Sequence, residues 1–88
     1  MEDRTLYQLC IQALRYARQR DNHLTPAVAV DNIKEAIDTM NYEYKLVTMF
    51  QIKREIEEDL YSYDRKYAYV WKDFLNDINT ILNQLKEI

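Results

Sequence analysis

The chain has 88 residues, a formal net charge of −3, one cysteine, one histidine and no glycine. A chain of this length forms one domain around one core, so we take residues 1–88 as a single domain. Glycine-rich phosphate loops, dinucleotide-binding turns and EF-hand loops are excluded because each needs glycine. One cysteine and one histidine exclude an internal disulfide and a zinc site made of these two residue types, and the negative charge disfavours nucleic acid as a partner.

The first predicted element is a helix from about Arg4 to Arg20. Its apolar residues recur at the spacing of one face of an amphipathic helix, namely Leu6, Leu9, Cys10, Ala13, Leu14 and Ala17. Cys10 belongs to this face, where we expect it to be a small buried hydrophobe. The mostly polar segment 21–24 predicts a loop, in which His23 is expected to be solvated.

The second predicted helix has the clearest start signal in the chain, Thr25 followed by Pro26. Threonine is a good N-cap, and proline loses no hydrogen bond at the first helical position. If each residue advances by about 100° around the axis, the apolar face that ends at Met40 and the next apolar face differ by roughly 140°. One straight helix cannot bury both faces in one core. We therefore place a break at residues 41–43 and assign it to Asn41, since asparagine tolerates the left-handed conformation that ends helices.

The remaining residues, 44–87, contain neither proline nor glycine, and their apolar face stays in phase within about 20°. A break at residues 62–64 gives four helices of about 17, 16, 19 and 22 residues, an all-α up-down four-helix bundle. The alternative without the break is a helical hairpin plus one long C-terminal helix, which must dimerise. Because globular helices average about 11–12 residues, we favour the bundle. Its core is predicted to bring together Leu14, Ile37, Ile56, Trp71, Phe74 and Ile78.

No convergent nucleophile, base and oxyanion donor can be read from the sequence, so we expect no catalytic residues, no enzymatic activity and no cofactor. Asp31, Glu35 and Asp38 share the polar face of the second helix and are interpreted as solvated. A loosely held divalent ion or a basic partner is the alternative for these carboxylates. A di-metal carboxylate bundle needs Glu-x-x-His pairs, which the sequence lacks, so we assign no metal site.

Two groups of residues leave the predicted core faces and are candidates for binding a partner. One is Ile11 on the outer face of the first helix, surrounded by Arg4, Arg15 and Arg18. Its alternative interpretation is that Ile11 packs against a neighbouring helix while the arginines pair with Glu55 or Asp59.

The other group consists of Tyr44, Val47, Tyr61 and Tyr69, and we prefer it because aromatic anchors carry more of an interface's energy than charged rims do. The eight tyrosines of the chain have an alternative explanation, the codon bias of a low-G+C genome.

The sequence as a whole predicts a small regulatory or interaction module that binds another protein through its surface. The alternative is a homo-oligomeric assembly component, for example a homodimer, built on a long C-terminal helix. A lone cysteine, the absence of an N-terminal signal pattern and the absence of a long apolar run predict a cytoplasmic protein without a membrane segment.

Overall fold

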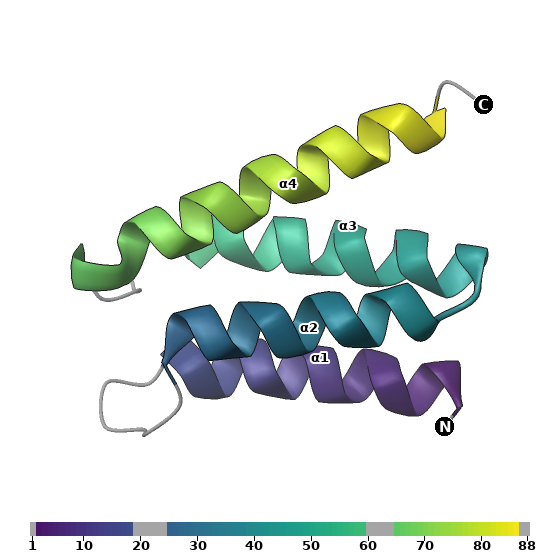
Figure 1. The fold of residues 1–88 in the computed structure, drawn as a ribbon, viewed down its shortest axis with the longest axis horizontal. Coiled ribbons are helices and arrows are strands. Elements are labelled where there is room, and N and C mark those ends of the chain that lie inside the picture. Colours follow the sequence, from purple (N-terminus) through teal and green to yellow (C-terminus); the bar gives the residue numbers. More distant parts are fainter. Residues whose placement is uncertain (1, 19–24, 60–64, 87–88) are drawn as a thin grey trace.

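The structure is a computed structural model that describes residues 2–18, 25–59 and 65–86. These ranges form four α-helices and one short 3-10 helix: α1 (Asp3–Arg18), α2 (Pro26–Thr39), α3 (Tyr42–Asp59), η2 (Arg65–Tyr67) and α4 (Ala68–Lys86). Consecutive helices run in opposite directions, so the molecule is an up-down four-helix bundle and the predicted fold class is confirmed (Figure 1).

The single long C-terminal helix is the alternative that the structure overturns. α3 ends at Asp59 and η2 begins at Arg65, and α3 and α4 pack against each other as separate helices. Helix lengths of 16, 14, 18 and 19 residues are close to the predicted ones. The predicted turn at residues 62–64 itself lies outside the described residues.

The four helices do not contribute equally to the packing. α2 and α3 each pack against all three other helices, whereas α1 and α4 lie at opposite edges of the bundle (Figure 1). The bundle is therefore flattened, with extents of 38 × 27 × 18 Å. This arrangement leaves the outer face of α3 open between α1 and α4.

All six residues predicted to form the core are buried in one cluster, which confirms that prediction. Leu9, which the sequence places on the core face of the first helix, is instead 45% exposed. On α1 the reason is a rotation. The buried face is centred roughly 60° from the predicted one, which turns Leu9 outward and brings Ile11 into the core.

The start predicted at Thr25 and the break predicted at Asn41 have different outcomes. The backbone N–H of Val28 donates to Thr25 Oγ1 at 3.4 Å, which confirms Thr25 as the N-cap of α2. The break at Asn41 is correctly placed, but its predicted cause is wrong. Met40 is extended, no described residue has a positive φ, and Asn41 Oδ1 accepts from the N–H of Tyr44 at 3.3 Å. Asn41 thus caps the start of α3 rather than ending α2 in a left-handed conformation.

Candidate functional site

The arginine patch predicted on α1 has no exposed Ile11 at its centre. Ile11 is only 7% exposed and belongs to the core, so its assignment to a partner-binding surface is wrong. Arg15 donates to Glu55 Oε1 from Nη2 at 2.7 Å and from Nε at 3.3 Å. This hydrogen bonding and the charge of Glu55 raise the pKa of the Arg15 guanidinium. The alternative interpretation, in which Ile11 packs against a neighbour and an arginine pairs with Glu55, therefore describes the structure.

The rest of the arginine patch gives no second anchor. Arg4 is exposed on the first turn of α1. The side chain of Arg18 lies outside the described residues, and so does that of Asp59, its other predicted partner.

The tyrosine group is divided between two ends of the bundle. Tyr44 is half-buried against the core near the start of α3, whereas Val47 is 54% exposed. Tyr69 is 64% exposed near the start of α4, which lies at the opposite end because α3 and α4 are antiparallel (Figure 1). Tyr61 lies outside the described residues. The structure therefore does not bring Val47 and Tyr69 into one surface.

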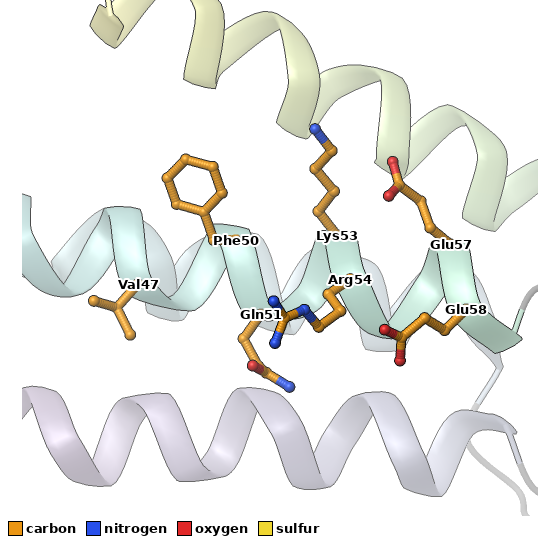
Figure 2. A pocket seen from close by; sticks show the side chains of 7 residues that line it. All are labelled: Val47, Phe50, Gln51, Lys53, Arg54, Glu57 and Glu58. Atoms are coloured by element: carbon orange, nitrogen blue, oxygen red, sulfur yellow. The ribbon is translucent and has the colours of Figure 1, made fainter.

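Val47 has a different neighbour on α3, Phe50, which is 44% exposed. Residues three apart on a helix are neighbours on its surface. Both residues line a shallow pocket of about 490 Å³ on the outer face of α3 (Figure 2), and we call this surface the α3 face: Val47, Phe50, Gln51, Lys53, Arg54, Glu57 and Glu58. In Figure 2 the side chains of Phe50 and Lys53 are directed toward α4, and that of Val47 toward α1.

Sequence reasoning left Phe50 unassigned, although a signal for it exists. At about 100° per residue, Phe50 lies within about 60° of Val47 and far from the face that carries Ile52 and Ile56. The same phase comparison that separated the helices would have placed Phe50 on the surface.

The charges of the α3 face balance. Glu57 and Glu58 follow Lys53 and Arg54 by four residues, so the described residues of the pocket carry two positive and two negative groups. The rim contains charged residues but has no net charge. Two apolar side chains beside such a rim resemble the composition of a protein interface more than that of a phosphate or nucleic-acid site.

A second depression lies between α2 and α4. It has a volume of about 320 Å³, and Met49 of α3 contributes to its lining, beneath Lys34 and Ile37 of α2 and Phe74 and Ile81 of α4. A smaller depression of about 180 Å³ continues toward Tyr69 and shares Lys34, Phe74 and Asp77 with it. We call the two together the α2–α4 groove.

One ion pair spans this groove. Lys34 Nζ lies 2.9 Å from Asp77 Oδ2 and 5.8 Å from the centroid of the Phe74 ring. Both charged side chains are about half exposed, so the pair is solvated and adds little to stability.

The cysteine and the carboxylates of α2, which were the other candidates for chemistry, form no site among the described residues. Cys10 is 1% exposed, its thiol faces the carbonyl oxygen of Ile33 at 3.9 Å, and burial raises its pKa to about 11, as expected for a small buried hydrophobe. Asp31, Glu35 and Asp38 are exposed, and among the described residues no three His, Cys, Asp or Glu side chains gather as metal ligands. His23 lies outside the described residues.

Comparison of the chain with protein-family models, curated proteins and solved structures finds no match. Within the described part of the chain, none of the helices combines the length and the hydropathy needed to cross a lipid bilayer. The physical character of the two surfaces is therefore the basis for assigning a function.

Proposed function

We propose that the protein is a small, non-enzymatic module that binds another protein through the α3 face. The observation that carries this proposal is the exposure of Val47 and Phe50, one helical turn apart, at 54% and 44%. Fully burying an exposed valine or phenylalanine side chain contributes about 1.5–3 kcal/mol. Since both side chains are about half exposed, a partner that covers them gains about half of that from each.

The surroundings of the pair support a protein partner. α1 and α4 flank the α3 face without covering it, so a partner side chain has access to Val47 and Phe50 (Figure 2). Lys53, Arg54 and the two glutamates form a polar rim, the usual surround of an interface hot spot. A neutral rim attracts neither the phosphates of nucleic acid nor anionic lipid headgroups. We further propose the cytosol as the compartment, since a lone thiol such as Cys10 stays reduced there.

The test is affinity capture with the 88-residue chain as bait in extracts of its source cells, followed by titration of the captured partner. Val47→Ser with Phe50→Ser is expected to weaken binding by about tenfold or more. Val28→Ser is the matched control, because Val28 is a valine of similar exposure, 46%, on α2.

Two results would contradict the proposal. Equal affinity of the wild-type protein and the double variant would show that the partner binds elsewhere. If light scattering shows a dimer that the double variant dissociates, the α3 face joins two copies of this chain rather than binding another protein.

A further inference from the structure

We infer that the α2–α4 groove is a second docking surface, and that its occupant is a basic amphipathic helix of a partner protein. The inference is independent of the α3 face, because the two surfaces use different sides of α3. Met49 reaches the groove from the inner side of α3, whereas Val47 and Phe50 lie on the outer side. In Figure 1, α2 and α4 lie in front of α3, and α4 is inclined to α2.

The interior of the groove is apolar. Ile37, Met49, Phe74 and Ile78 line it as members of the core, and Ile81 stands at its edge with 43% of its surface exposed. At the other end Tyr69 is 64% exposed. Because the four core residues are at most 7% exposed, the apolar surface open to an occupant is that of Ile81 at one end and Tyr69 at the other. An occupant that covers the groove must therefore offer apolar side chains to both ends.

The rim of the groove is acidic. Asp31 and Asp38 of α2 and Asp73 and Asp77 of α4 are all exposed, and among the residues that the structure describes Lys34 is the one cation that lines the groove. Four aspartates and one lysine give the groove a formal charge of −3, which equals the net charge of the whole chain. The potential over the groove therefore favours a cationic partner and repels nucleic acid and anionic membranes.

Lys34 shows how a partner's cation fits. Its ammonium group already lies against Asp77 and the Phe74 ring from within the molecule. Because this pair is exposed and weak, a lysine or arginine of the occupant can take over Asp77 at small cost. The acidic groups on both walls then require positive charges on both flanks of the apolar stripe.

The length of the groove suits a helix. α2 and α4 run in the same direction along it (Figure 1), and the lining residues on α2 run from Ala27 to Asp38, which span about 17 Å. That distance accommodates about three helical turns. An amphipathic helix supplies apolar residues at i, i+3, i+4 and i+7 for such a groove, with lysine or arginine beside them.

The probe for this inference is a fluorescent 18-residue helical peptide with leucine on one face and lysine on both flanks. A peptide of the same composition, with its leucines spread around the helix, is the control for general charge attraction. Binding is measured by anisotropy at low and high salt, and the bound surface is mapped by amide chemical shifts. Thermal unfolding of every variant verifies that it folds.

We expect the amphipathic peptide to bind and the scrambled peptide to bind at least about tenfold more weakly. Asp73→Asn with Asp77→Asn should reduce affinity by about tenfold and flatten the salt dependence. Ile81→Ser should reduce it by about fivefold or more. The matched charge control, Glu57→Gln with Glu58→Gln on the α3 face, should leave it unchanged.

Several outcomes would overturn the inference. Equal binding of both peptides, or an equal loss in the Glu57 and Glu58 control, would reduce it to non-specific charge attraction. Shifts mapped to the α3 face would place the peptide on the other surface. A homodimer that Ile81→Ser dissociates would make a second copy of the chain the occupant. Failure of Val47→Ser with Phe50→Ser to affect any partner would refute the proposed function and leave this result standing.

Discussion

Arg15 of α1 and Glu55 of α3 form an ion pair between two helices, with 2.7 Å between Nη2 and Oε1. The two side chains differ in environment: that of Arg15 is 59% exposed and that of Glu55 only 12%. Among the described residues, no donor reaches the buried Oε2 of Glu55. Arg15 therefore offsets the cost of burying the Glu55 carboxylate, whereas the exposed guanidinium is hydrated and depends less on the carboxylate.

This asymmetry predicts the result of a double-mutant cycle. Arg15→Ala should destabilise the bundle, because it leaves a largely buried carboxylate without its cation. Adding Glu55→Leu to that variant should recover stability, since the apolar side chain needs no partner. Urea unfolding of the four proteins measures the coupling. A cycle with no interaction energy would show that the pair contributes nothing to joining α1 and α3.

Cys10 contributes stability to the bundle that is lost at alkaline pH. Burial raises the thiol pKa from 9.0 to about 11 in the folded state. The unfolded chain therefore releases this proton at a lower pH than the folded chain, so the contribution is fully present below pH 9 and is lost as pH rises through about 11. Denaturation between pH 8 and 11 should show a steeper loss of stability for the wild type than for Cys10→Ala. Parallel curves would mean that the thiol is accessible to solvent.

Phe74 and Phe50 form a matched pair for testing the core. Phe74 is 2% exposed in the core, whereas Phe50 is 44% exposed on the α3 face. Phe74→Ala should cost about 3–5 kcal/mol of unfolding free energy. Phe50→Ala should cost about 1 kcal/mol or less, as surface changes usually do. A loss below about 1 kcal/mol for Phe74→Ala in chemical denaturation would mean that α4 is not docked on the core as described.

Two caps should contribute similar amounts at different helices. Thr25→Ala removes the acceptor for Val28 N–H at the start of α2, and Asn41→Ala removes the acceptor for Tyr44 N–H at the start of α3. Each should cost about 1 kcal/mol without changing the oligomeric state. Replacing Asn41 with glycine discriminates between the helix-ending role predicted from the sequence and the N-cap role observed in the structure. Glycine would stabilise a left-handed helix end, but it lacks the side-chain acceptor that the N-cap of α3 uses.

The parts of the fold that the sequence predicts are those that depend on local chemistry or on strong periodicity. Thr25 and Pro26 mark the start of α2 by their own side chains, and the α4 stripe through Trp71 and Phe74 predicts burial because its phase is unambiguous. The predicted centre of the buried face of α1 is wrong by roughly 60°, because Leu9 and Ile11 flank the apolar stripe on either side. Only the positions of α2 and α3 decide which of the two enters the core.

The candidate surfaces were harder to predict for the same reason. Val47 and Tyr69 both expose apolar surface, but the antiparallel arrangement of α3 and α4 separates them, and no local pattern contains that information. The α2–α4 groove depends on the inclination of α4, which arises from packing between helices. Its acidic residues are visible in the sequence, but their convergence on one groove is not.

Tyr44 and Val47 give the last prediction, because the structure separates two residues that the sequence placed in one surface group. Tyr44 packs against the core, whereas Val47 is 54% exposed. Tyr44→Ala should therefore lower the unfolding free energy by about 1–3 kcal/mol, while Val47→Ser should change it by about 0.5 kcal/mol or less. Urea denaturation of the two single variants separates the effects, and Val28→Ser provides the exposed-valine reference. Loss of partner binding by Val47→Ser at unchanged stability would identify a contact residue. If Val47→Ser unfolds the bundle and Tyr44→Ala leaves it intact, the buried face of α3 is the opposite of the one described.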